Sequence, residues 1–336
     1  MFRSALVLLA FAVVVLPAAA SSPGRNGALL LSAGLEPPGE CGGLPGPPSF
    51  APVAHDADVS CDQNDTGAAG VFLAGPGRKL IRWRLRPGYF PGTFIGRRGR
   101  VVLRGPDRSL RVARLGATGM IRLRWRGDNP AGSADGRWVA FERGAVYGPT
   151  GPPGGVWVAP VGAGKARFVG DGVNPRWSTS GRLAFDGTRS DSRGWYRTGV
   201  MITSGDAREP QRLMVLGAGE TMSVMDWSPS GKELLVVRTW ADERDEEKSR
   251  SALFAVRSDG RGVRRLTSYD VGSDASFTSS ALWSPDGRRI AFVRSNRAGG
   301  TTVYTASARP GAPQGFRMWR RMLRDVGSVA DWQSMR

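Results

Sequence analysis

The side chains that most often act in catalysis are scarce in this chain. His55 is the only histidine among the 336 residues, so a Ser-His-Asp triad would have to be built around that one side chain. The sequence has no Gly-x-Ser-x-Gly elbow and no His-Glu-x-x-His pair. The Gly-Ala-Gly-Lys stretch at 162–165 lacks the spacing of a phosphate-binding loop and the Ser or Thr that follows its lysine. We therefore expect no catalytic residue and no cofactor.

Acidic side chains gather in one short stretch. The aspartates of this stretch are Asp56, Asp58, Asp62 and Asp65. Carboxylate oxygens are ligands that calcium prefers, but this spacing does not match the calcium-binding loop of EF-hands. Two cysteines with a single histidine make a poor zinc site. The sequence favours a solvated polar loop here and predicts no metal.

Arginine is the remaining candidate for chemistry. The net charge is +18 with 47 basic residues, which favours attraction to anionic partners. Three segments, 78–86, 121–127 and 316–324, alternate arginine with apolar residues, as strands with one basic face would. On adjacent outer strands they would form a basic belt, which consists of Arg82, Arg84, Arg86, Arg122, Arg124, Arg320 and Arg321. Such a belt would hold an acidic polymer or a membrane surface, or it would only prevent edge pairing; both interpretations stay open.

The elements that must position these side chains come from an internal repeat. The stretch ALWSPDGRRIAFVRS at 281–295 has counterparts at 226–239, 176–189, 131–144 and, in degenerate form, 95–105. Proline and glycine suit a type I turn, and Asp286 can bond to nearby backbone amides. The apolar run 290–293 is typical of a strand buried between two sheets. A tryptophan before each turn would fill the wedge between neighbouring sheets: Trp177, Trp227, Trp283 and Trp332.

The spacing of the repeat predicts the architecture. Its turn glycines are Gly27, Gly99, Gly136, Gly181, Gly231 and Gly287. Most of their intervals bracket the length of one four-stranded propeller blade. We therefore expect an all-β fold, a six-bladed β-propeller of four-stranded blades. The half-copy around Asp331 and Trp332 would complete the blade that begins at Gly27, which closes the ring and removes exposed strand edges.

Propellers commonly bind ligands at the axis, where the innermost strands converge. The strands that lead to the tryptophan positions should be innermost. Polar residues near their starts are candidates to line a channel mouth: Asp128, Asn129, Asn174, Ser223, Ser279 and Ser328. This expectation rests on the fold alone, and ordinary solvated side chains would give the same pattern.

The repeat resembles a known family. Trp-Ser-Pro-Asp-Gly at 283–287, Ile-Ala-Phe at 290–292, Asp-Gly at 259–260 and Arg-Arg-Leu-Thr at 264–267 are similar to the repeat of TolB-type propellers. The resemblance is strongest over 226–295 and weaker over 70–190. It implies a periplasmic envelope protein that binds partner proteins and has no catalytic role. TolB proteins also carry an α/β domain before the propeller, which we expect to be missing here because the first repeat begins near Gly27.

The beginning of the chain indicates export. An early arginine, an apolar run over 5–17 and small residues at 18–21 predict a secretory signal peptide, residues 1–20, cleaved near Ala20. Residues 21–336 would then be a single propeller domain, with 35–66 as an insertion in the first blade. Cys41 and Cys61 lie in that insertion, and in an oxidising compartment they are most simply a disulfide.

Together these features predict a binding protein. We expect a monomeric propeller that is secreted, periplasmic or peripherally associated with the cell envelope. Its partner would be a protein or an anionic envelope component; we expect no nucleic acid, which the charge alone would permit, because an exported protein lacks access to it. The alternatives are a propeller-type lyase, lactonase or glycosidase, or a carbohydrate-binding module, acting at the channel mouth.

Overall fold

The structure is a computed structural model. It describes residues 25–33, 70–74, 80–83, 85, 88–96, 99–115, 117, 119–144, 155–191, 194–214, 216, 220–240, 250–268, 270–271, 278–295, 301–310, 316–318 and 326–335. The predicted signal peptide and both cysteines lie outside these residues, as do His55 and the aspartates at 56–65. The described part is built of strands and one short 3-10 turn, η1 (Gly205–Ala207), so the all-β expectation is confirmed.

The strands form five antiparallel sheets. One contains β4 (Phe90–Phe94), β5 (Arg100–Arg104), β6 (Ser109–Arg114) and β7 (Met120–Arg126). The next has seven strands: β8 (Asp128–Gly132), β9 (Trp138–Arg143), β10 (Gly155–Pro160), β11 (Arg167–Trp177), β12 (Leu183–Asp191), β13 (Gly194–Ile202) and β14 (Gln211–Arg212).

The remaining sheets follow in chain order. The third contains β15 (Glu220–Trp227), β16 (Glu233–Trp240), β17 (Arg250–Arg257), β18 (Arg264–Arg265) and β19 (Asp270–Val271). The fourth contains β20 (Thr278–Trp283), β21 (Arg289–Ser295), β22 (Thr301–Ser307) and β23 (Phe316–Met318). The last joins both ends of the chain: β24 (Val326–Met335), β1 (Arg25–Ala33), β2 (Gly70–Ala74) and β3 (Leu80–Trp83).

Strand β11 belongs to two four-stranded units. Its first half pairs with β10, from Arg167 opposite Val158 to Asp171 opposite Gly155. Its second half pairs with β12, beginning with Gly172 opposite Gly187. The seven-stranded sheet therefore consists of β8 to the start of β11, and the end of β11 to β14.

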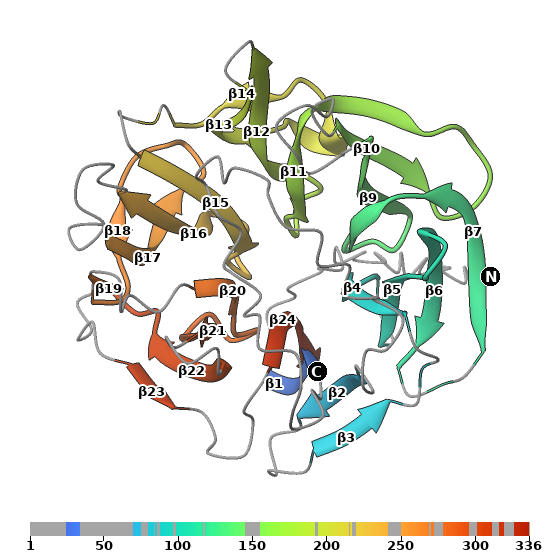
Figure 1. Cartoon of the computed structure of the whole chain (residues 1–336), viewed down its shortest axis with the longest axis horizontal. Helices are drawn as coiled ribbons and strands as arrows, with labels where there is room; N and C mark the ends of the chain where they lie inside the picture. The colour runs from blue at the N-terminus through green and yellow to red at the C-terminus, as the bar shows by residue number, and fades with distance from the viewer. Residues whose placement is uncertain are drawn as a thin grey trace, which may run out of the picture.

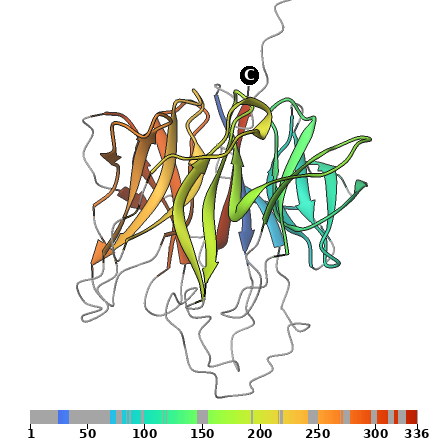
Figure 2. The ribbon, with the colours of Figure 1, turned by 90° about the horizontal axis from the view of Figure 1, so that it is seen from above.

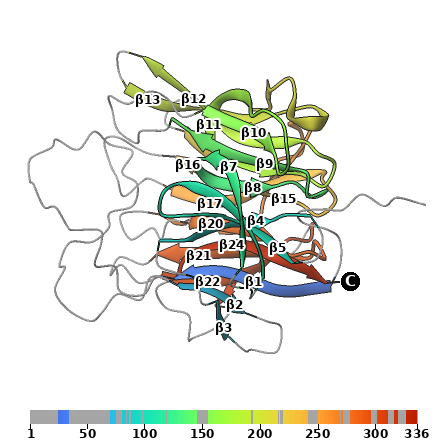
Figure 3. The same cartoon turned by 90° about the vertical axis from the view of Figure 1, so that its right-hand side faces the viewer.

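The sheets are arranged around a common centre (Figure 1); the seven-stranded sheet contributes two innermost strands, β8 and β11, and each of the other sheets contributes one. Successive innermost strands are in contact: β4 with β8, β8 with β11, β11 with β15, β15 with β20, β20 with β24, and β24 with β4. The strands run across the thickness of the molecule (Figure 2). Strands β1 and β24, from opposite ends of the chain, lie side by side (Figure 3), with Leu29 opposite Trp332 and Leu30 opposite Asp331.

The core lies between neighbouring sheets rather than within one. Trp227 is fully buried against Ala184 and Val200 of the preceding unit and against Leu234 of its own. Its indole Nε1 donates to the Arg176 carbonyl, 2.9 Å away. Trp177 and Trp283 are buried in the same way, so the wedge predicted for these three tryptophans is confirmed. Strand β24 contains Trp332, whose side chain lies outside the described residues.

One repeat carries Gly132 where the others have tryptophan. A Cβ added to Gly132 would lie 2.4 Å from the Cβ of Ile95. Ile95 is fully buried and packs with Val139 and Phe141, so it fills the space that a tryptophan fills elsewhere. Packing against the neighbouring sheet, rather than the repeat pattern, therefore determines which residue fits at position 132.

The turns form as their sequence predicts. The turn glycines Gly99, Gly136, Gly181, Gly231 and Gly287 all have φ between +62 and +77°, the left-handed region that glycine adopts without strain. The Asp286 carboxylate accepts hydrogen bonds from the Ser284 hydroxyl (2.6 Å) and the Arg288 amide (3.0 Å). The expectation for Gly27 was wrong: it lies inside β1, because β24 and β1 are not connected by a hairpin and the strand continues through this position.

Candidate functional site

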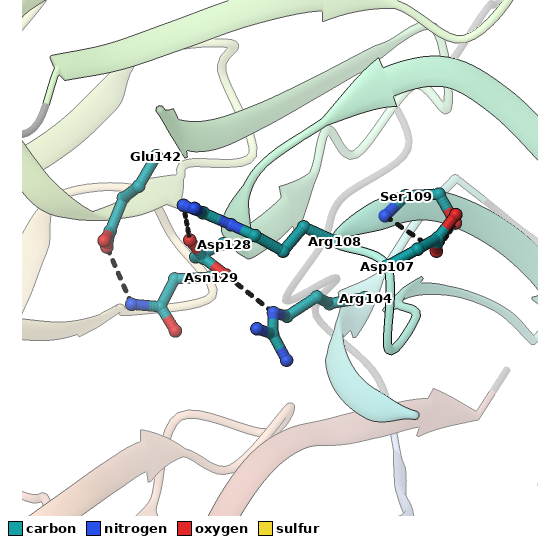
Figure 4. Close-up of polar contacts among 7 residues, drawn as sticks. All are labelled: Arg104, Asp107, Arg108, Ser109, Asp128, Asn129 and Glu142. Atoms are coloured by element: carbon teal, nitrogen blue, oxygen red, sulfur yellow. Dashed lines mark hydrogen bonds and ion pairs between the residues drawn. The ribbon is translucent and has the colours of Figure 1, made fainter. Parts of the chain in front are cut away.

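The innermost strands carry a polar cluster, and Asp128, the first residue of β8, marks its beginning (Figure 4). Its carboxylate accepts from Arg104 Nε at 2.6 Å and from Arg108 Nη2. The Arg104 guanidinium also lies over the Phe90 ring, 5.2 Å from its centroid. Arg108 is in the left-handed region, with φ of 59°. One carboxylate and one aromatic ring thus hold two guanidinium groups in place.

Next to this group lies the buried carboxylate of Glu142, which stands near the end of β9, opposite Asp128 of β8. Its side chain is fully buried. Its Oε1 accepts from Asn129 Nδ2 at 2.8 Å and from the backbone amide of Asn174 at 2.7 Å. Asn129 belongs to the same unit as Glu142, whereas Asn174 belongs to the next. A buried carboxylate is tolerated only when it is hydrogen-bonded, and here the donors come from both sides of a boundary between units.

Asp186 repeats this arrangement one unit further along. It is fully buried and lies on β12, opposite Val173 of β11. Its Oδ2 accepts from Asn174 Nδ2 at 2.8 Å and from the Ser223 hydroxyl at 2.6 Å, and its Oδ1 accepts from the Val224 amide at 2.6 Å. We call Glu142 and Asp186 with these donors the carboxylate latches, because each ties the innermost strand of one unit to that of the next.

The two asparagines have a conformational reason to be there. Asn129 has φ of 43° and Asn174 has φ of 55°, a region that asparagine enters more readily than most residues. Each lies at an irregularity of strand pairing, between Asp128 and Ala131 in β8 and between Val173 and Arg176 in β11. The irregularity directs the asparagine side chain to the latch carboxylate on the paired strand.

Sequence analysis missed the latch carboxylates although the repeat contains a signal for them. Five residues occupy equivalent positions of the repeat: Arg104, Glu142, Asp186, Val237 and Val293. In that order, strand pairing places them opposite Phe90, Asp128, Val173, Ser223 and Ser280. Each ends a buried run, and the runs are VVLR, VAFE, LAFD, LLVV and IAFV. A charged residue at the end of an otherwise buried run identifies the polar part of the cluster.

A third carboxylate ties β15 to β20. Asp226 accepts from the amide of Trp227 through Oδ1 and from the amide of Trp283 through Oδ2, both at 2.8 Å. Burial of the carboxyl raises the pKa of Asp226 to about 7, against these two hydrogen bonds and the nearby Arg176, which lower it. Asp226 directly precedes the Trp-Ser-Pro motif at 227–229, and its bonds to the Trp227 and Trp283 amides join one repeat to the next, which is a structural role.

The structure brings together four of the six residues predicted at the channel mouth: Asp128, Asn129, Asn174 and Ser223. Asn174 and Ser223 are joined directly, 3.2 Å apart, and both bond to Asp186. Ser279 lies in β20 and Ser328 in β24, and their side chains lie outside the described residues.

The basic belt is described in part. On β7, Arg122 and Arg124 are exposed and Leu123 between them is buried, but Ile121 is exposed as well, so the alternation holds for only part of the strand. Arg122 donates to Asp107 at 2.9 Å. Strands β3, β7 and β23 lie at the outer edges of consecutive sheets (Figure 1). Strand β3 contains Arg82, whose side chain is not described, and Arg84, Arg86, Arg320 and Arg321 lie outside the described residues.

Within the described ranges, no group of three or more His, Cys, Asp and Glu residues could hold a metal ion. No helix in the same ranges is long and apolar enough to cross a membrane.

Comparisons with known proteins identify the fold. No family model matches the chain, and no curated protein matches it. A solved structure of a putative TolB from Agrobacterium tumefaciens is similar, with a TM-score of 0.56 and 15% identity, covering 76% of this chain and 87% of that one. TolB from Acinetobacter baumannii gives a TM-score of 0.52 at 11% identity, covering 74% of this chain and 61% of that one.

An oligogalacturonate lyase in complex with manganese is also similar, with a TM-score of 0.48 and 13% identity over 70% of this chain and 67% of the lyase. Identities this low bear on fold and not on activity. The chain therefore has a TolB-like β-propeller fold, and the comparisons leave its activity open.

Proposed function

We propose that the chain is an exported, non-enzymatic propeller that binds a protein or an anionic polymer of the cell envelope. In this proposal the ring has six four-stranded blades, because β11 serves as the outer strand of one blade and the inner strand of the next. Pairing of β24 with β1 closes it. Support comes from the unbroken contacts between successive innermost strands and from the antiparallel ladder of β1 and β24.

One observation carries the binding role: among the described residues of the polar cluster, the carboxylates of Glu142 and Asp186 are engaged in the fold, while guanidinium groups stay accessible there and on β7. Glu142 and Asp186 are fully buried and hold neighbouring strands together. Arg104 and Arg108 are partly exposed in the same cluster, and Arg122 and Arg124 are exposed on β7. Buried carboxylates held in this way do not meet a substrate, whereas exposed arginines suit recognition of carboxylate or phosphate groups.

One observation favours the enzyme alternative. Asp226 has a pKa of about 7, the range that suits a general acid or base. However, both of its carboxylate oxygens accept hydrogen bonds from backbone amides, which supports a structural role instead.

The test is salt-dependent binding of the mature chain to immobilised polyglutamate. The basic-belt variant carries Arg82, Arg84, Arg122, Arg124, Arg320 and Arg321 changed to Gln. The matched control changes the same number of exposed arginines elsewhere to Gln: Arg137, Arg208, Arg212, Arg257, Arg261 and Arg288. We expect the belt variant to elute at lower salt than the control, although the two have equal net charge. Equal elution would mean that charge alone, and not the belt, governs binding.

A further inference from the structure

The structure assigns a carboxylate-binding site to Arg104 and Arg108, at the end of the sheet formed by β4 to β7 where β5 turns into β6. The inference rests on the proposed function, because it names the chemistry by which a partner is recognised. It concerns a surface separate from the basic belt on β7.

The Arg104 guanidinium is oriented but not saturated. Its Nε donates to Asp128 Oδ1, and its face lies over Phe90. Among the described residues, its two terminal nitrogens have no hydrogen-bond partner, and Figure 4 shows them pointing away from Asp128. A guanidinium presents a rigid planar fork of N–H donors that matches the two oxygens of a carboxylate. Arg104 thus offers such a fork already fixed in direction.

Arg108 supplies the second cation through a strained backbone. Its φ of 59° places it in the left-handed region, and its amide and carbonyl bond to Gly105 and Gly127, at 2.9 Å each. One Nη bonds to Asp128, and nearly half of its side chain is exposed. A non-glycine residue held in this region by its surroundings is a feature that clusters at functional sites.

The local charge selects the ligand. Two guanidinium groups and the single carboxylate of Asp128 leave one net positive charge, which matches one carboxylate. Two other nearby acids are engaged elsewhere. Glu142 is buried and accepts from Asn129 and from the Asn174 amide. The Ser109 hydroxyl and amide hydrogen-bond to Asp107, lowering its pKa, and Arg122 pairs with it. Phe90 beside Arg104 is 48% exposed, so an apolar or aromatic group next to the ligand's carboxylate would find a surface to contact.

Benzoate is the probe that combines these features. Its binding to the full mature chain would be measured by saturation-transfer NMR of the benzoate protons at constant ionic strength, with sodium chloride and sodium phosphate as competitors. We expect saturable binding of benzoate. Chloride should not compete with benzoate, and phosphate should compete only weakly. No saturation, or binding abolished by chloride, would overturn the site; stronger binding of phosphate would overturn the assignment to a carboxylate.

Substitution locates the site. Arg104→Lys keeps the charge but removes the fork, so we expect the benzoate affinity to fall about tenfold, which corresponds to loss of one strong charge-assisted contact. Arg137→Lys is the matched control: Arg137 is an exposed arginine on the turn after β8, also paired with an aspartate, Asp135. Unchanged affinity in Arg104→Lys, with a thermal midpoint equal to wild type, would overturn the proposal.

The two proposals fail separately. If benzoate binds at Arg104 but polyglutamate binding does not depend on the belt, the carboxylate site stands and the belt does not. If polyglutamate binding depends on the belt and benzoate does not bind, the carboxylate site is wrong and the broader binding role stands.

Discussion

At the scale of single residues, the charges of this chain divide into two groups with different tasks. The buried acids Glu142 and Asp186 hold strands of neighbouring units together. The arginines around Asp128 and on β7 remain accessible. A buried carboxylate with donors on two units behaves as a structural part, because its removal takes a hydrogen-bond acceptor from every donor that reaches it.

Asp186→Ala tests this view of the latches. The change removes the Asp186 acceptor from the side-chain amide of Asn174, the hydroxyl of Ser223 and the backbone amide of Val224, all in a buried setting. We therefore expect the free energy of unfolding to fall by about 3 kcal/mol. Urea denaturation measures it. Asp259→Ala, at an exposed turn where the carboxylate pairs with Arg257, is the control and should lower it far less, because solvent screens an exposed ion pair. Equal effects would contradict a special role for Asp186.

Asp226 predicts a dependence of stability on pH. Its pKa is about 7 in the folded chain and near 3.8 when unfolded, so the folded state binds the proton more tightly. The resulting stability is fully present below about pH 4 and is lost as the pH rises through about 7.

Urea denaturation at pH 5 and pH 8 measures this contribution. The Asp226→Asn variant should show a smaller loss of stability between the two values than wild type, because the titrating group is gone. Asp259→Asn is the control, since hydrogen bonding to the Arg261 amide lowers the pKa of Asp259 and moves its titration below this range. A loss of the same size in Asp226→Asn and wild type would show that other groups set the dependence.

At the scale of elements, the repeat predicts strands and turns well because both are local. The turn glycines and the alternation over residues 122–124 of β7 need only the chain around them. The pairing irregularities at Asn129 and Asn174 were not predictable, because they depend on which buried acid faces the strand across the sheet. The same limit applies to Gly132, because the space left by Ile95 of the preceding sheet determines which side chain fits there.

Gly132→Ala tests the contact between β8 and Ile95. The added methyl group would overlap the Ile95 side chain and backbone, so we expect a loss of about 1–3 kcal/mol in the free energy of unfolding. In an Ile95→Gly background the added loss should be smaller, since the Cβ and Cγ1 atoms of Ile95 that overlap the new methyl group are gone. Gly119→Ala, with no atom within 4 Å of the added Cβ, is the control. Additive losses in the double variant would contradict direct packing of these residues.

At the scale of the whole molecule, the first and the last of the described strands, β1 and β24, pair with each other. Sequence analysis predicted the partnership of the 329–336 segment with the first strand, and the register of β1 and β24 agrees with it. What the sequence did not predict is the uneven distribution of charge among the repeats. Arg104, Glu142 and Asp186 are replaced by Val237 and Val293 in the later repeats, so the polar cluster occupies one part of the ring.

Removal of residues 326–336 tests the closure of the ring. The truncated chain loses the β24 partner of β1 and the contacts of β24 with β20 and β4, which exposes strand edges. We expect lower stability and faster hydrogen exchange in β1, β20 and β4 than in β16. A synthetic peptide of residues 326–336 should restore protection. Unchanged exchange in β20 and β4 would contradict closure by β24.

Capture of a partner from the producer's own envelope fraction tests the central claim, which is recognition of an envelope component through the arginine surface. Mature wild-type chain, the basic-belt variant and the matched control variant would each be used as bait at low and at high salt. The binding role predicts one partner that wild type and control capture at low salt, that high salt releases, and that the belt variant fails to capture. Capture that survives both high salt and the belt substitutions would contradict it.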